Sequence, residues 1–312
     1  LVAVMAVISA TAIERLTLAT RLAASANAIE QARHYKLAAE ALAIKRIAQL
    51  AKGKSQVTLD GDWLGKPFLL PLPGGGSAEL TLTDGGNCFN LNSLVADSTV
   101  GGSAQRPLAL EQFIALMQAV SIDRATAERI AASSGDWIDA DQNAVAQGAE
   151  DAAYAGSATP HRTADRSMTD ASELRAVAGV GPREWAQLRP WVCALPTSDL
   201  SPINVNTLLP EQAPLLMMLM PTQLSPGQAR AHLASRPVGG YGSLNRFWSG
   251  PTLGGQQPTG DAASQVKLTT RWFRLRTKVR IGSSTAVSET LIDAGESDTP
   301  PRIVRRSDGA DE

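Results

Sequence analysis

Residues 1–52 read LVAVMAVISATAIERLTLATRLAASANAIEQARHYKLAAEALAIKRIAQLAK and contain neither glycine nor proline. Ala, Leu, Ile, Glu, Arg and Lys dominate this stretch, and most of these residues favour helix. One helix of about 50 residues is ~75 Å long at 1.5 Å per residue, far above the usual length in globular proteins. The stretch therefore predicts a single long N-terminal helix over residues 1–53.

The two halves of this helix differ in polarity. Residues 1–13 form an apolar run that is too short by itself to span a bilayer, which takes about 20 residues. After Glu14 and Arg15, apolar residues recur at helical spacing. This asymmetry predicts a partial transmembrane segment, the lower end of a membrane helix that begins before residue 1, followed by an amphipathic half that packs on a domain. A buried core helix is the alternative.

The rest of the chain alternates between strand-like and helical stretches. Short strand-like runs come first, then a long helical part, and then strand-like runs again, before a polar, proline-containing end. This order predicts an α+β fold with a large all-α domain inserted between strands. The predicted boundaries are 54–95 and 261–295 for the two parts of the β region, 96–260 for the α-domain and 296–312 for a flexible tail.

The charge balance argues against general attraction to nucleic acid. The chain has 29 Lys and Arg against 30 Asp and Glu, a formal net charge of −1. Proteins that bind nucleic acid usually carry a clearly basic domain or patch. The length of 312 residues is enough for about two domains with sizeable cores.

The two cysteines, Cys88 and Cys193, leave two states open. In a reducing compartment both would be buried thiols, whereas in an oxidising compartment they would form one disulfide. Closing a loop of about 100 residues would stabilise the fold by up to ~4–5 kcal/mol in the chain-entropy model. The spacing alone does not decide between these states.

Residues 135–154, GDWIDADQNAVAQGAEDAAY, collect five carboxylates, and no Lys or Arg lies between Arg129 and Arg162. Like charges repel, so a fold that gathers these residues needs water, distant cations or a metal. Oxygen ligands of this kind suit Ca²⁺, although the spacing departs from that of an EF-hand loop. A solvated acidic loop is the alternative. The acidic residues are Asp136, Asp139, Asp141, Glu150 and Asp151.

Two other function classes fit these patterns less well. Residues 177–181, VAGVG, followed by a helix resemble a helix-hairpin-helix, in which backbone N–H groups hold DNA phosphates, so a DNA-binding or uptake protein is the alternative function. Residues 172–196 and 203–248 carry net charges of only +1 and +2, which gives little counterion release. An enzyme is disfavoured because His34, His161 and His232 lie in no catalytic motif.

Seven segments in order resemble the K-type minor pseudopilin of the bacterial type II secretion system. They are residues 31–42, 88–94, 136–141, 148–154, 172–180, 188–196 and 203–207. The resemblance implies a pilin-like domain whose hydrophobic N-terminal helix packs into a fibre, with an α-domain inserted between its strands. It also implies a role without catalysis at the tip of the pseudopilus, where the chain would initiate or cap the fibre and support protein export across the outer membrane.

The same resemblance implies a location and partners. The chain would be a single-pass protein of the bacterial inner membrane, anchored by its N-terminal helix, with the globular part in the periplasm. Its expected partners are the I- and J-type minor pseudopilins, with the major pseudopilin and secreted substrates as further candidates and no nucleic acid.

Site residues are also implied by the resemblance. The family has a calcium site in the acidic region and a disulfide in the segments that hold the two cysteines. We therefore expect a Cys88–Cys193 disulfide, and Ca²⁺ is the expected cofactor. The expected ligands are Asp139, Asp141, Glu150 and Asp151, with Asp136 as a fifth candidate that would support the loop and with Gln142, Asn143 or backbone carbonyls completing the shell.

Overall fold

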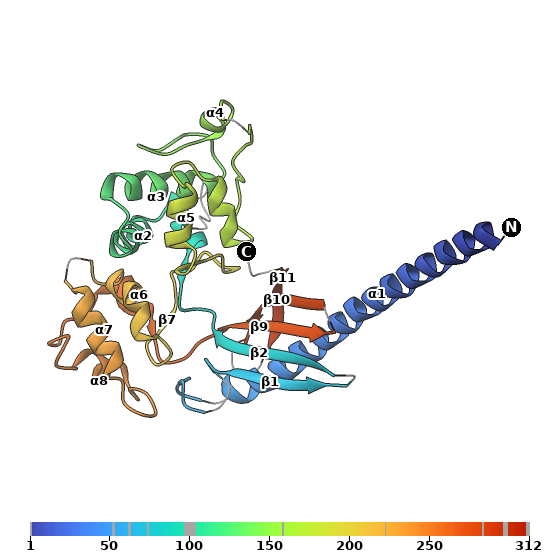
Figure 1. Cartoon of the computed structure of the whole chain (residues 1–312). Coiled ribbons are helices and arrows are strands. Elements are labelled where there is room, and N and C mark those ends of the chain that lie inside the picture. Colours follow the sequence, from blue (N-terminus) through green and yellow to red (C-terminus); the bar gives the residue numbers. More distant parts are fainter. Residues whose placement is uncertain are drawn as a thin grey trace. The chain divides into compact units, whose positions relative to one another are not determined.

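The computed structural model describes residues 2–51, 54–61, 64–73, 75–96, 104–157, 159–221, 223–282, 284–295 and 299–309. The chain divides into two compact units (Figure 1). We call them the sheet unit, formed by Leu1–Lys52, Gly61–Thr83 and Trp272–Glu312, and the helical unit, formed by Gly53–Asp60 and Asp84–Arg271.

Helix α1, Val2–Ala51, confirms the predicted long helix. An 18-residue window of it has a mean hydropathy of 1.7 and none of it is buried, so the helix is long and apolar enough to cross a membrane. Further along, Ala32, Ala39, Ala43 and Ile47 are buried at intervals of one or two helical turns. The second half is thus amphipathic as predicted, while the first half is exposed and is not a buried core helix.

The sheet unit contains one five-stranded sheet in the order β1-β2-β9-β10-β11 (Figure 1). The pairs β1·β2, β9·β10 and β10·β11 are antiparallel, and α1 packs on β9 and β10. Two strands precede the helical unit in the sequence and three follow it, which confirms the predicted insertion. The strands are Pro67–Leu72, Gly76–Asp84, Trp272–Ile281, Ser284–Asp293 and Arg302–Asp308.

The predicted flexible tail, 296–312, is wrong for residues 302–308, which form strand β11. This strand is held by α1 as well as by β10. Arg306 Nη2 lies 2.9 Å from Glu40 Oε2, and Lys36 Nζ lies 2.7 Å from Asp308 Oδ1. The partners are more than 250 residues away in the sequence, so the local polar composition could not reveal the strand. Residues 296–298 and 310–312 of the predicted tail lie outside the described residues.

The compact units also move the predicted domain boundaries. The breaks expected at 95/96 and 260/261 lie at 83/84 and 271/272. Residues 55–59 form no strand, and Val57 N donates to Leu268 O at 2.7 Å inside the helical unit. The run at 266–270 contributes only the short strand β8, which pairs within the helical unit rather than with the five-stranded sheet. Strand-like sequence was therefore not a sufficient guide to membership of the sheet.

The helical unit is built from short helices around one core. Phe89 stacks on Phe113 with ring centroids 4.6 Å apart, and both side chains are fully buried. Its helices are α2 Pro107–Ala119, α3 Arg124–Ile138, α4 Asp151–Tyr154, α5 Pro182–Leu188, α6 Ala213–Met217, α7 Pro226–Ala234, α8 Leu244–Trp248 and α9 Gly260–Ser264, with 3-10 turns at Leu91–Leu94, Ala171–Ala176 and Pro210–Gln212.

In the part of the helical unit that the structure describes, three two-stranded pairs accompany these helices, so the unit is mainly rather than purely helical. They join β3 Phe89–Asn90 to β6 Val192–Cys193, β4 Val95–Ala96 to β5 Ala104–Gln105, and β7 Ile203–Asn204 to β8 Val266–Lys267.

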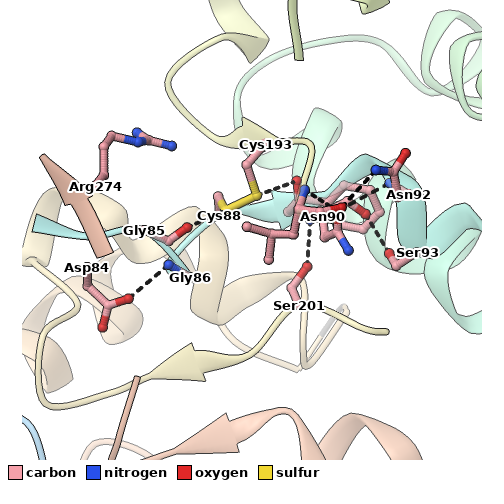
Figure 2. The surroundings of a disulfide bond; sticks show 12 residues. Asp84, Gly85, Gly86, Cys88, Asn90, Asn92, Ser93, Cys193, Ser201 and Arg274 are labelled. Carbon is pink, nitrogen blue, oxygen red and sulfur yellow. Dashed lines mark hydrogen bonds between the residues drawn. A yellow bond between two sulfur atoms is a disulfide. The ribbon is translucent and has the colours of Figure 1, made fainter. Parts of the chain in front are cut away.

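A disulfide joins Cys88 to Cys193 beside the β3·β6 pair, as expected, with the two Cα atoms 5.8 Å apart (Figure 2). Two buried asparagines next to it bind backbone from distant parts of the chain. Asn90 Oδ1 accepts from Leu195 N at 3.0 Å, and Asn92 Nδ2 donates to Met168 O at 2.9 Å. Such bonds satisfy backbone groups that loops would otherwise bury without partners.

Candidate calcium site

The acidic stretch occupies the connection between α3 and α4. Helix α3 begins after Asp123, whose side chain accepts from Thr126 N, and ends at Ile138. Asp139 is the C-terminal cap of α3, and its extended backbone turns the chain into the loop. Glu150 is the residue before α4 and also has an extended backbone. The loop therefore leaves and re-enters helical structure at two of the predicted ligands.

Three of the predicted ligands come together. Asp139, Asp141 and Glu150 each offer a carboxylate oxygen, and these oxygens lie within 4.8 Å of one another. Asp139 and Glu150 are 5% exposed, while Asp141 faces solvent. Among the described residues, no hydrogen-bond donor reaches Asp139 Oδ1 or either Glu150 oxygen, and all three atoms are buried. Buried carboxylate oxygens without donors are costly, and a hard divalent cation such as Ca²⁺ satisfies them.

The electrostatics of the group support the same interpretation. Burial, opposed in part by a hydrogen bond from Gln105, raises the pKa of Asp139 to about 6, and the charge of Asp141 adds to the rise. Burial also raises the pKa of Glu150 to about 7, together with repulsion from Asp136 and Asp139. Such carboxyls bind a proton more readily than usual because burial and the neighbouring carboxylates disfavour their charged form. A bound Ca²⁺ would supply that balance.

Asp136 lies beside this group but is not one of its three members. Its Oδ1 accepts from Gln105 Nε2 at 2.8 Å and from Val145 N at 3.4 Å, and burial raises its pKa. The Oδ2 atom is buried without a partner, and a Cβ added to Gly148 would lie only 2.0 Å from it. This geometry fits a residue that holds the loop closed, and a side chain at position 148 would have to displace the Asp136 carboxylate.

Asp151 lies outside the group of three. Its Oδ1 accepts from Thr163 N at 2.9 Å and from Thr163 Oγ1 at 3.0 Å, and Arg162 Nε is 3.7 Å from its Oδ2. The residue thus ties the start of α4 to the following segment. Asn143 N donates to Asp141 Oδ1 at 2.8 Å, which fixes the exposed member of the group.

Sequence reasoning missed two residues of this region. Gln105 reaches Asp136 from a short strand more than 30 residues away. Asp165 accepts from Thr163 Oγ1 at 2.7 Å and from Gln142 Nε2 at 3.3 Å, and its charge contributes to the raised pKa of Glu150. Asp165 follows Arg162 in the sequence, outside the cation-free stretch, so no local signal singled it out. Its positive φ of 50° became visible only in the structure.

Residues 177–181, on which the DNA-binding alternative rests, form the predicted turn, but backbone N–H groups of this turn are already hydrogen-bonded. Gly179 has a positive φ of 89°, and α5 begins at Pro182. Gly181 N already donates to Glu184 Oε2 at 2.9 Å, and Val180 N donates to Val177 O. A phosphate approaching these amides would meet the Glu184 carboxylate, which repels it.

Comparison with known proteins agrees with the fold. Two family models, both described as Type II secretion system (T2SS), protein K, match residues 87–197 and 203–270. Type II secretion system protein K of Pectobacterium carotovorum is 33% identical over 301 residues, covering 94% of this chain and 89% of that protein. The chain belongs to the type II secretion system protein K family. The Aeromonas hydrophila protein K is likewise 33% identical over 320 residues, covering 100% of this chain and 95% of its own length.

A solved structure shares the fold of this protein K. It belongs to the crystal structure of the GspK-GspI-GspJ complex from the enterotoxigenic Escherichia coli type 2 secretion system. The TM-score is 0.79 at 30% sequence identity, with 91% of this chain and 98% of that chain covered. The likeness confirms the pilin-like α+β fold and identifies the chain as a minor pseudopilin, a structural component of a secretion system.

Proposed function

We propose that this protein K lies at the tip of the type II secretion pseudopilus, where it assembles with I- and J-type minor pseudopilins. There it initiates or caps the fibre and so supports protein export across the outer membrane, without catalysis. The observation that carries the proposal is the likeness, over 91% of the chain, to a protein solved within a GspK-GspI-GspJ complex.

The properties of α1 and of the disulfide support the proposed location. The first half of α1 is apolar and exposed, which suits a single-pass anchor in the inner membrane and, after extraction, a helix packed among other pseudopilin helices. The Cys88–Cys193 disulfide suits an oxidising compartment, which for this topology is the periplasm. The major pseudopilin and secreted substrates are further proposed partners.

We also propose that the helical unit holds Ca²⁺ through Asp139, Asp141 and Glu150. The support is the convergence of their oxygens within 4.8 Å, together with the lack of a hydrogen-bond donor, among the described residues, for Asp139 Oδ1 and for both Glu150 oxygens. The ion would join the end of α3 to the start of α4 and fix the intervening loop. Its role would be structural, with Asp136 and Asp151 supporting the loop rather than binding the ion.

Co-purification tests the proposed assembly. The full chain, solubilised in detergent, is co-expressed with the I- and J-type pseudopilins of the same bacterium, and a tag on the I-type protein is used for capture. We expect a stoichiometric three-protein complex by size-exclusion chromatography with light scattering. The matched control carries the same tag on an unrelated periplasmic protein, which is co-expressed with this chain in place of the I- and J-type proteins and should not retain it. Recovery of this chain as a monomer, with the other two proteins forming a complex without it, would contradict the proposal.

A further inference from the structure

The five-stranded sheet has two faces of opposite character. On β2, Ala78, Leu80 and Leu82 are buried, and Ala78 packs with Ala32 of α1 and Val279 of β9. Successive side chains of a strand point to opposite faces. The residues between the buried ones on β2 and β9 therefore lie on the face opposite α1, and they are polar or charged.

This opposite face is hollowed into a groove of about 460 Å³. Its lining combines short threonine side chains of β2 with longer charged side chains of β2, β9 and β10. The described residues that line it are Thr81, Thr83 and Glu79 of β2, Arg274, Arg276 and Lys278 of β9, and Glu289 of β10.

The cations of the groove form a regular row. Arg274, Arg276 and Lys278 occupy alternate positions of one strand, so neighbours are about 6.6–6.8 Å apart along it. Arg274 Nε lies 3.2 Å from Glu289 Oε1, and Arg276 is the direct cross-strand partner of Glu289. The row is held by the central strand of the sheet, so its spacing is fixed by backbone hydrogen bonds rather than by a loop.

We propose that this groove binds an extended, acidic segment of a partner polypeptide, with carboxylates at alternate positions. An extended peptide repeats its side chains on one face with the same spacing as the cation row, so successive carboxylates meet successive cations. Three cations against two acids leave the lining with a net positive charge. The proposal is independent of the calcium site and of which pseudopilins assemble with this chain.

A polypeptide suits the groove better than a nucleic acid does. Glu79 and Glu289 stand on the strands that flank the cation row. A phosphodiester backbone is anionic along its whole length and would meet both carboxylates. A polypeptide can place carboxylates over the row and neutral or basic side chains at its flanks, which satisfies all the charges of the groove.

Peptide binding to the full chain in detergent tests the proposal. The probe is the fluorescently labelled peptide SESESES, and its isomer SSEEESS has the same charge in a block. Binding is measured by fluorescence anisotropy at low salt for the unaltered chain, for the double variant Arg276→Glu, Lys278→Glu, and for the control Arg230→Glu, which reverses an exposed charge on α7. Thermal melting confirms that each variant is folded.

We expect the alternating peptide to bind the unaltered chain, to bind the double variant at least about tenfold more weakly, and to bind the Arg230→Glu control unchanged. We also expect a clear preference for SESESES over SSEEESS. Three results would overturn the proposal: no measurable binding, equal binding of the two peptides, or equal loss of affinity in both variants. Tighter binding of a DNA duplex than of SESESES, lost in the double variant, would assign the groove to nucleic acid instead.

Discussion

Reduction of the Cys88–Cys193 disulfide should strongly destabilise the helical unit. The bond spans 105 residues, and in the chain-entropy model a loop of that length corresponds to about 4.8 kcal/mol at 25 °C. The free energy of unfolding of a domain is only about 5–15 kcal/mol, so this is a large share. For a unit of about 200 residues, each kcal/mol shifts the melting temperature by about 2–4 °C, which predicts a fall of about 10–19 °C.

Thermal melting of the full chain in detergent, followed by circular dichroism with and without a thiol reductant, measures this effect. The double variant Cys88→Ala, Cys193→Ala is the matched control, because it should melt near the reduced protein and should not respond to reductant. Both cysteines are buried, so denaturant is needed to complete the reduction before refolding. A reduced protein that melts within about 2 °C of the oxidised one would refute the chain-entropy reasoning, since loop closure would then contribute almost nothing.

Three further predictions concern the candidate calcium site and the C-terminal strand. Ca²⁺ at a hundred times its dissociation constant should stabilise the helical unit by about 2.7 kcal/mol, or about 5–11 °C in melting temperature. Asp139→Asn should abolish this gain and Asp151→Asn should retain it, as measured by melting in EDTA and in Ca²⁺. The folded-state pKa values of Asp139 and Glu150 are raised to about 6 and about 7, so the folded protein binds protons more readily than the unfolded chain does. The metal-free protein should therefore gain stability as the pH falls from 7.5 to 5, whereas its affinity for Ca²⁺ should fall over the same range. Calorimetry would measure both effects. Glu40→Gln should cost about 1–2 kcal/mol, because Glu40 is buried while its partner Arg306 is half exposed, and it should speed hydrogen exchange in β11. Unchanged exchange in β11 would show that the Glu40–Arg306 ion pair does not hold that strand.

The parts of the fold that the sequence predicted depend on local pattern. The absence of glycine and proline over residues 1–52 is enough to predict α1, because helix propensity acts residue by residue. The alternation of apolar and polar residues predicted β9 and β10, because successive side chains of a strand point to opposite faces. The insertion followed from the order of strand-like and helical stretches, which needs no knowledge of contacts.

The parts that failed depend on distant partners. Strand β11 has four charged residues among seven, a composition typical of a solvated tail. In the fold, Arg306 of this strand forms an ion pair with Glu40 of α1, and the strand pairs with β10. The short strand β8 has good strand propensity yet pairs with β7 in the helical unit. Propensity indicates that a stretch can be extended, and only tertiary contacts decide which sheet it joins.

The candidate site divides in the same way. The acidic stretch located Asp139, Asp141 and Glu150, because carboxylates without nearby cations are visible in the sequence. The separation of Asp151 from that group was not visible, since it depends on hydrogen bonds from Thr163. Asp165 was missed because it lies after Arg162, outside the stretch without Lys or Arg. Proximity in sequence thus predicted the region, while the geometry of the loop selected the residues.

The helical unit has short helices and several links between distant parts of its chain, and the short helices depend on these links for stability. Apart from α2 and α3, its α-helices have between four and nine residues, and helices shorter than about 12 residues are marginal by themselves. Their stability must therefore come from tertiary contacts. The disulfide closes residues 88–193, the asparagines beside it bind distant backbone, and the proposed ion closes the loop from Asp139 to Glu150 inside that span. Cross-links thus take the place of long regular elements in this insertion, and this explains why a disulfide and the proposed cation site would lie in the same unit.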